Sequence, residues 1–420
     1  MGSKGKQNTH QYKIRVRIMW WLTIFYFLTL SLSTLSAQGV GGEKYSKIIL
    51  LFVLLIGYLA KRKIKQIDSV FISLACFLVF GIYSALRGID INNSLPLLLG
   101  LTLLYFFVKT HTDTLSLLQI KKTILAHSWI INVYVLITLL AMFFFPSWVD
   151  YLPGDFHPYA GLAKVPATSA AILLGGLFFN ALSFILVEKK SSKLINLILC
   201  FFTFVVIFRI NARTTELSIL LFLAMAYFCL ITHLNESNFK SALLKFLFLF
   251  LPLLGVLIVS FYVLRHITLY SHLNLFHQEH VDAIKGFTLD GRTTMWAASF
   301  NEFIHSSYVL RGVGYGNAFY FLELCQIVYL TTHNILIDML YSTGVIGCLL
   351  FLCFIIFSLL GALKNYFLTH DTLHWIFFMS LLTIFFQSQG ESSLNSLMTT
   401  HLYLWILFYT FSMKLGSVKK

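Results

Sequence analysis

Apolar runs of membrane-spanning length follow one another along almost the whole chain, separated by short polar connections. We count twelve, at residues 18–37, 47–60, 67–86, 94–109, 124–145, 168–187, 194–209, 216–232, 245–265, 340–363, 374–389 and 400–413. A helix of about 20 apolar residues crosses the hydrocarbon core of a bilayer and satisfies its own backbone hydrogen bonds there. The pattern therefore predicts an all-α integral membrane protein with about twelve transmembrane helices. Two runs are less regular, since 47–60 is short and 374–389 ends in Gln387 and Gln389.

Composition agrees with this class. Of 420 residues, 58% are apolar and only 11% are charged, with a mean hydropathy of +0.80, whereas about 25% of the residues of soluble domains are charged. The net charge of +14 is spread between the apolar runs instead of forming a patch, so we expect no nucleic-acid partner. The first run is interpreted as a retained helix, because Leu35 stands where a signal peptide cleaved after Ala37 needs a small residue.

The distribution of positive charge predicts the orientation in the membrane. With a cytoplasmic N-terminus and twelve alternating spans, the inner segments hold 21 of the 31 Lys and Arg residues and the outer segments hold 10. This is the positive-inside asymmetry of inner-membrane proteins. Both termini are therefore expected in the cytoplasm of a bacterial cell.

The outer positive charges differ in kind from the inner ones. The inner segments carry 18 Lys and 3 Arg, whereas the outer segments carry 4 Lys and 6 Arg. The planar guanidinium group binds two phosphate oxygens at once, and an ammonium group acts as a point charge. We therefore expect a phosphorylated ligand on the outer face, although each arginine alone is equally consistent with anchoring at lipid headgroups. The six arginines are Arg87, Arg209, Arg213, Arg265, Arg292 and Arg311.

One outer segment, residues 266–332, is much longer than the others. A connection above about 15 residues is usually functional or disordered. Trp296, Phe300 and Phe303–Ile304 recur at helical spacing within it, which predicts a short helix whose start Asp290 or Thr293 caps. The chain thus divides into spans one to nine (1–265), this long periplasmic loop (266–332) and spans ten to twelve (333–420).

The six cysteines indicate neither a disulfide framework nor a metal site. No C-x-x-C pair or His/Cys cluster is present, so we expect no metal. All but Cys325 fall within apolar runs, where they are interpreted as small buried residues; they are Cys76, Cys200, Cys229, Cys348 and Cys353.

Three outer motifs carry arginine or glycine. "INARTTEL" (210–217) places Arg213 at the membrane surface, where a charge is costly and usually functional; a local pair with Glu216 is the simpler alternative. "LDGRTTMW" (289–296) places Arg292 before a predicted helix, whose N-terminus favours anions; the alternative is a solvated charge. "RGVGYGNAF" (311–319) lacks the βαβ unit of a dinucleotide site, so its glycines are expected to permit a tight turn beside a headgroup or sugar.

A fourth motif, "TTHNILIDML" (331–340), puts His333 and Asn334 directly ahead of an apolar run. Asn334 is expected to cap the following helix. His333 then lies at the helix N-terminus, where a neutral imidazole suits a general base acting on a hydroxyl group. Taken alone, His333 is better explained as an interfacial residue bonded to a backbone carbonyl, and only the surrounding motifs favour the base. "DFHPYAG" (155–161) adds His157 and Tyr159 to the same face as weaker candidates.

In this order and topology, the motifs over residues 155–350 resemble the O-antigen ligase and polymerase family. The resemblance rests on Arg213 to Leu217, Gly291-Arg292 with Trp296, the G-x-G-x-G-N of 312–317, and His333-Asn334 followed by "STGVIG". It implies a membrane glycosyltransferase of the GT-C type that transfers a glycan from undecaprenyl diphosphate to an acceptor, without cofactor or metal. The acceptor is a sugar of lipid A–core in a ligase and a lipid-linked repeat unit in a polymerase.

Carried onto this chain, the resemblance implies catalytic roles for three residues. Arg213 and Arg292 would bind the diphosphate leaving group, and His333 would activate the acceptor hydroxyl, with inversion at the anomeric carbon. The remaining candidates for substrate binding are Arg209, Arg265, Arg311, His157, Tyr315, Asn317 and Asn334.

Three functions remain open on the sequence. A ligase is preferred to a polymerase because one large loop precedes His333-Asn334, although "NARTTEL" departs from the Ser-Arg-Gly sequence common in ligases. A transporter of a lipid-linked sugar is less favoured. Transporters place polar groups near the bilayer midplane, whereas the ionisable residues here gather at the outer boundary and the middles of the spans are nearly free of them.

Overall fold

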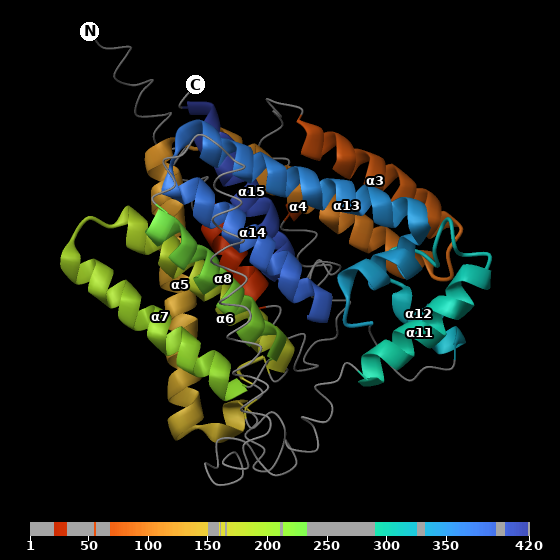
Figure 1. The fold of residues 1–420 in the computed structure, drawn as a ribbon, viewed down its shortest axis with the longest axis horizontal. Helices are drawn as coiled ribbons and strands as arrows, with labels where there is room; N and C mark the ends of the chain where they lie inside the picture. The colour runs from red at the N-terminus through yellow and green to blue at the C-terminus, as the bar shows by residue number, and fades with distance from the viewer. Residues whose placement is uncertain are drawn as a thin grey trace.

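A computed structural model of the chain describes residues 21–31, 54–55, 68–149, 159, 161–163, 166–210, 213–232, 290–325, 332–391 and 400–418. Within these ranges the protein is a bundle of long α-helices (Figure 1). The bundle comprises α3 (Ser69–Leu86), α4 (Ile91–Thr114), α5 (Leu117–Phe144), α6 (Pro166–Leu186), α7 (Lys190–Ile210), α8 (Arg213–Thr232), α13 (Ile335–Thr369), α14 (Thr372–Glu391) and α15 (Thr400–Val418). The shorter helices are Trp21–Ser31, η1 (Pro146–Val149), α11 (Asp290–His305) and α12 (Ala318–Leu324).

The expectation of an all-helical membrane protein is confirmed. Six of the described helices are long and apolar enough to cross a bilayer, namely α3 to α7 and α13. The predicted runs at 216–232, 374–389 and 400–413 are also helices, α8, α14 and α15, and the run 18–37 contains the helix Trp21–Ser31. The runs 245–265 and nearly all of 47–60 lie outside the described residues, so the count of twelve spans stays a prediction.

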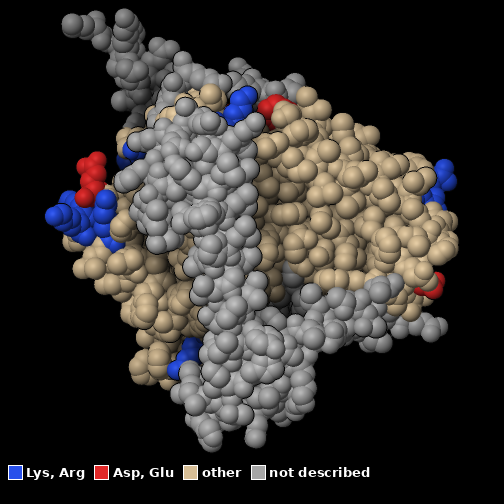
Figure 2. Space-filling view, viewed as in Figure 1, with Lys and Arg blue, Asp and Glu red and all other residues tan. Residues whose placement is uncertain are grey.

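The outer surface of the bundle is apolar, as contact with lipid requires. Figure 2 shows that, on the face drawn, the Lys, Arg, Asp and Glu residues of the described part lie at the margins of a broad surface free of charge. Large apolar side chains of the bundle, such as Val79, Trp129 and Phe201, are exposed. Cys76 and Cys353 are also exposed, so the expectation that they are buried is wrong; their helices turn them outward, whereas Cys348 is buried.

α15 lies at the centre of the bundle. Every residue from Thr400 to Ser412 is buried, because α15 packs against α4, α6, α13 and α14. A helix that is buried all round must satisfy its own polar groups within the protein. Here His401 bonds the carbonyl of Ala171 at 2.9 Å, and Tyr403 bonds His127 of α5 at 3.0 Å.

His127 is an ionisable group inside the bundle, in a run that the sequence predicts to be almost free of such groups. It lies within α5, is fully buried, and stacks on Tyr26 with ring centroids 4.5 Å apart. Its Nδ1 bonds the carbonyl of Thr123 at 2.8 Å. Hydropathy averaged over a run does not reveal one histidine that aromatic neighbours enclose.

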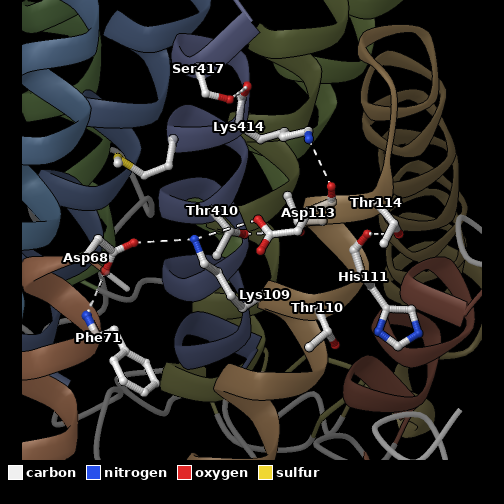
Figure 3. A network of polar contacts seen from close by, with 12 residues as sticks. Asp68, Phe71, Lys109, Thr110, His111, Asp113, Thr114, Thr410, Lys414 and Ser417 are labelled. Carbon is white, nitrogen blue, oxygen red and sulfur yellow. Dashed lines mark hydrogen bonds and ion pairs between the residues drawn. The ribbon is translucent and has the colours of Figure 1, made fainter. Parts of the chain in front are cut away.

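A second buried polar group connects α3, α4 and α15 (Figure 3). The Nζ of Lys109 lies 3.4 Å from Asp68 Oδ2 and 3.7 Å from Asp113 Oδ1, and the side chain of Lys109 is only 4% exposed. Lys414 of α15 donates a hydrogen bond to the carbonyl of Asp113 at 2.9 Å. Lys109 therefore joins helices inside the bundle.

α13 is divided by a kink at Gly344, whose φ of 71° and ψ of −178° interrupt the helix. Residues 308–317, which we call the glycine clamp, cross α13 at this point. The N–H groups of Val313 and Gly314 donate to the carbonyls of Tyr341 and Ser342 at 2.9 and 2.8 Å. The kink frees these carbonyls from the helix, and the clamp satisfies them.

Glycine is required where the clamp meets α13. Gly344 has a positive φ, and a Cβ there would lie 2.3 Å from the carbonyl carbon of Leu310. Gly312 also has a positive φ, and a Cβ on it would lie 2.3 Å from the carbonyl oxygen of Ser342. The glycines therefore allow the clamp and α13 to approach each other backbone to backbone.

Candidate active site at the loop end of the bundle

The candidate site lies at the loop end of the bundle, by which we mean the end where α11 and α12 lie beside the first segment of α13 (Figure 1). That segment, Ile335 to Thr343, begins directly after His333 and Asn334. The side-chain Oδ1 of Asn334 accepts hydrogen bonds from the N–H groups of Leu336 and Ile337 at 3.0 and 3.2 Å. The predicted helix cap is confirmed.

His333 has a backbone conformation that is unusual for its residue type. Its φ of 53° is in the left-handed region, which costs a residue with a side chain about 1–2 kcal/mol. Such strain persists only where neighbouring contacts determine it, and it is concentrated at functional sites. Here Asn334 fixes the chain on one side and Thr332 on the other, so the half-buried imidazole of His333 has a defined position.

Thr332 is held by a buried carboxylate. Its Oγ1 lies 2.6 Å from Asp338 Oδ1, and both side chains are buried. A hydrogen bond to a buried charged group is stronger than one between neutral groups. Asp338, one turn into α13, thereby positions the peptide that precedes His333, a role that the sequence alone did not indicate.

α11 docks on the same segment and brings Arg292 toward it. The indole N–H of Trp296 donates to the carbonyl of Thr332 at 2.8 Å, and the Ser299 hydroxyl lies 2.7 Å from the Tyr341 hydroxyl. The helix predicted from Trp296, Phe300 and Phe303 is confirmed as Asp290–His305. Arg292 lies one turn before Trp296, although its side chain is outside the described part of the structure.

α14 connects this segment to the start of α8. The side-chain amide of Asn334 donates to the carbonyl of Gln389 at 3.1 Å, and the amide of Gln387 donates to the hydroxyl of Thr215 at 2.7 Å. Thr215 follows Arg213, the first residue of α8, by two positions. The side chain of Arg213 also lies outside the described part, but the start of its helix is joined to Asn334 through α14.

The first turns of α8 and α13 are thus connected through α14, and α11 is connected to the first segment of α13 through Trp296 and Ser299. Helix N-termini carry partial positive charge and unpaired N–H groups, which favour a bound anion. Gln387, which with Gln389 marked the run 374–389 as a poor span, connects α14 to α8 through its side-chain amide, whereas Gln389 accepts from Asn334 through its backbone carbonyl. The signal in the sequence was therefore one polar amide, Gln387, at the end of a span.

The other predicted residues divide into three groups. Arg209 is exposed in the last turn of α7, and no described contact joins it to His333. Arg311 lies in the glycine clamp, with its guanidinium carbon 5.8 Å from the centre of the Tyr308 ring. Arg265 and His157 lie outside the described residues.

Tyr315 and Asn317 are buried and contact other parts of the protein. Tyr315 is buried against Phe77, and burial raises the pKa of its hydroxyl above the usual value. The amide nitrogen of Asn317 donates to the Asp90 carbonyl at 2.8 Å and to the Ser94 hydroxyl at 2.9 Å, and its oxygen accepts from Asn93 at 2.7 Å. The contacts of Asn317 attach the clamp to the start of α4, and both side chains are buried.

Removing the Asn334 cap should loosen the site. Asn334→Ala loses both the cap and the contact with Gln389, and an N-cap residue contributes about 1 kcal/mol. We expect a lower unfolding temperature in detergent, measured by intrinsic fluorescence, and a slower transfer reaction. Asn334→Asp keeps the cap and loses only the donor to Gln389, so its unfolding temperature should stay near that of the wild type. Equal stability of the alanine variant and the wild type would contradict the role of the cap.

The fold and the site together define a class, a multi-pass α-helical membrane protein whose polar site is built from a loop and from helix ends at one end of the bundle. Residues 197–352 match the protein-family model described as O-antigen ligase. This segment is similar to the O-antigen ligase family, and the resemblance inferred from the sequence is confirmed. Comparison with curated proteins gives no match.

The matched segment contains most of the candidate site. It runs from α7 through α8, α11 and α12 to Leu352 in α13, and it includes Arg213, Arg292 and His333. α14, with Gln387 and Gln389, lies outside it. The structure therefore adds a helix to the site that the family match does not cover.

Proposed function

We propose that the protein is an inner-membrane O-antigen ligase, which transfers a glycan from undecaprenyl diphosphate to a sugar hydroxyl of lipid A–core at the periplasmic face. The observation that carries the proposal is that hydrogen bonds connect α8, through α14, and α11, through Trp296, to the start of α13 at Thr332 and Asn334. Two of these helices begin with an arginine in their first turn, and the third begins next to His333. The reaction requires groups that stabilise an anionic leaving group and a base that takes the proton of a hydroxyl group.

In the proposed reaction, His333 takes the proton of the acceptor hydroxyl. The acceptor oxygen forms a bond to the anomeric carbon while the bond from that carbon to the diphosphate oxygen breaks. The electron pair of the broken bond stays on undecaprenyl diphosphate, and Arg213, Arg292 and the helix N-termini stabilise its negative charge. Attack from the face opposite the leaving group inverts the anomeric carbon, and no nucleotide sugar is used.

Complementation tests the proposal. Expression in a ligase-null strain should restore O-antigen on lipid A–core, observed as a ladder on a lipopolysaccharide gel. Expression in a polymerase-null strain should leave a core with a single repeat unit. Restored long chains in the polymerase-null strain, with none in the ligase-null strain, would instead assign the protein as a polymerase.

The two arginines make a separate prediction. Arg292→Lys keeps the charge and loses the planar pair of donors, and we expect the transfer rate to fall by roughly 10²-fold, the loss seen when one transition-state donor is removed. Arg213→Lys should behave in the same way. The rates are measured with purified protein and a lipid-linked donor, with Lys193→Gln, at the far end of the bundle, as the control. Full activity of both lysine variants would exclude diphosphate binding by these side chains.

A further inference from the structure

Arg87 and Arg311 come together at the edge of the bundle, on segments far apart in sequence. The hydroxyl of Ser84 donates to the carbonyl of Arg311, and the N–H of Ile89 donates to the carbonyl of Val313 at 2.8 Å. Arg87 lies between Ser84 and Ile89, at the C-cap of α3. The end of α3 therefore runs alongside the glycine clamp, and the two arginines are carried by neighbouring backbones.

Neither arginine has a carboxylate partner within the described part of the chain. Arg87 is exposed. Arg311 packs its guanidinium against Tyr308, and its Nε is buried with no hydrogen-bond partner among the described residues. Asp90, on the same connection as Arg87, is occupied elsewhere, since it caps α4 and accepts a hydrogen bond from Tyr320 at 3.1 Å. Two guanidinium groups thus retain donors for an external anion.

The surface beside these arginines is apolar. Ile82 and Leu86 of α3 are exposed, as is Leu310 next to Arg311. Val345 and Ile346 are exposed on α13 just after its kink, and α13 packs along α3. This surface combines an apolar strip on α3 and α13 with two guanidinium groups that have no carboxylate partner among the described residues. It is therefore complementary to a lipid, whose acyl chains are apolar and whose headgroup carries phosphate.

The distance between the glycine clamp and His333 indicates which class of lipid fits the site. The clamp contacts α13 at Ser342, nine residues after His333, which corresponds to about 14 Å along a helix. A lipid whose phosphate lies at the clamp can reach His333 only through a head group of several sugars. An ordinary phospholipid has no hydroxyl at that distance, whereas a phosphorylated glycolipid does.

From this arrangement we propose that Arg87 and Arg311 form the phosphate-binding site for the lipid acceptor, with the acyl chains against α3 and α13. The proposal rests on the proposed function for the identity of the acceptor, lipid A–core. It places the acceptor at the edge of the bundle and its reacting sugar at the first segment of α13. The donor diphosphate, bound by Arg213 and Arg292, then occupies a different site.

Binding is tested apart from catalysis. The full-length protein carrying His333→Ala is placed in phosphatidylcholine nanodiscs, and retention of bisphosphorylated lipid A and of its dephosphorylated form is measured by native mass spectrometry. We expect lipid A to bind at least 10-fold more tightly than its dephosphorylated form, and Arg311→Gln or Arg87→Gln to remove this difference. Lys193→Gln, which removes a charge at the far end of the bundle, should leave it unchanged. A difference that survives both arginine substitutions would overturn the proposal.

Two further experiments identify which phosphate-bearing lipid occupies the site. Adding phosphatidylglycerol to the nanodiscs should displace little lipid A, whereas competition at equal concentrations would assign the site to bulk phospholipid and reject an acceptor site. In the transfer assay, Arg311→Gln should raise the KM for the acceptor about 10-fold and leave the KM for the donor unchanged. A rise in the donor KM would place Arg311 with the diphosphate. If no transfer occurs at all, the proposed function fails, while phosphate-dependent lipid A binding stands or falls on the nanodisc result.

Discussion

Replacing His333 with alanine is expected to lower the transfer rate by about 10²- to 10⁴-fold, the usual contribution of a positioned general base. The reason is geometric as well as chemical. Asn334 and Thr332 fix the backbone on both sides of His333 in a left-handed conformation, so the imidazole is presented in one place. The rate is measured with purified protein, lipid-linked donor and lipid A–core, and added imidazole should restore part of it.

The left-handed backbone makes the choice of variant important. Alanine is strained at a φ of 53° and could lower stability by itself, whereas asparagine accepts this conformation readily. His333→Asn should therefore remain as stable as the wild type and yet lose the same activity as His333→Ala. His305→Ala, which removes an exposed histidine at the end of α11, serves as the control and should remain active. A fully active His333→Asn variant would rule out the proposed base.

Replacing Lys109 with methionine should destabilise the folded protein by about 3–5 kcal/mol, the cost of removing one partner from a buried charge pair. The substitution leaves the carboxylates of Asp68 and Asp113 close together without the ammonium group between them. We expect a large fall in the unfolding temperature in detergent and poor accumulation in the membrane. Because Lys109 is at the end of α4 opposite Asp90 and the clamp, the protein that does fold should retain its transfer activity.

A triple variant separates charge from packing. Asp68→Asn with Lys109→Met and Asp113→Asn removes all three charges, and asparagine can still cap α3 as Asp68 does through Phe71 N–H at 2.8 Å. Replacement of a whole buried charge group by neutral residues is often neutral for stability, so the triple variant should unfold close to the wild-type temperature. If the triple variant is as unstable as Lys109→Met, the charge-pair explanation is wrong.

The sequence predicted the helices well because each depends on local information. Apolar runs and the Asn334 cap are properties of a few neighbouring residues, and they were found near their observed bounds. Helix ends were less accurate. α5 begins at Leu117, seven residues before the predicted run, because Lys121 and Lys122 lower the hydropathy of a first turn and a half that is nonetheless helical.

The site was predicted only as a list of residues. Order along the chain indicated that Arg213, Arg292 and His333 share one side of the membrane, but not which contacts join their helices. Those contacts are made by the backbone carbonyls of Thr332 and Gln389 and by the side chains of Thr215 and Gln387. A carbonyl leaves no signal in the sequence, and Thr215 and Gln387 are common polar residues with no motif of their own. Tyr315 and Asn317 were singled out from a conspicuous glycine-rich motif, and the structure shows the contacts that this motif did not reveal: Tyr315 packs against Phe77 of α3, and Asn317 bonds the start of α4.

The kink at Gly344 has a consequence for acceptor choice. The first segment of α13 is rigid and is held at both ends, by the Asn334 cap and by the clamp at Ser342, so its length acts as a fixed spacer between His333 and Arg311. One inserted residue would lengthen the spacer by about 1.5 Å and rotate one end relative to the other by about 100°. On this view, members of the family that modify acceptors with shorter or longer sugar heads would differ in the length of this segment, and not in the residues of the active site.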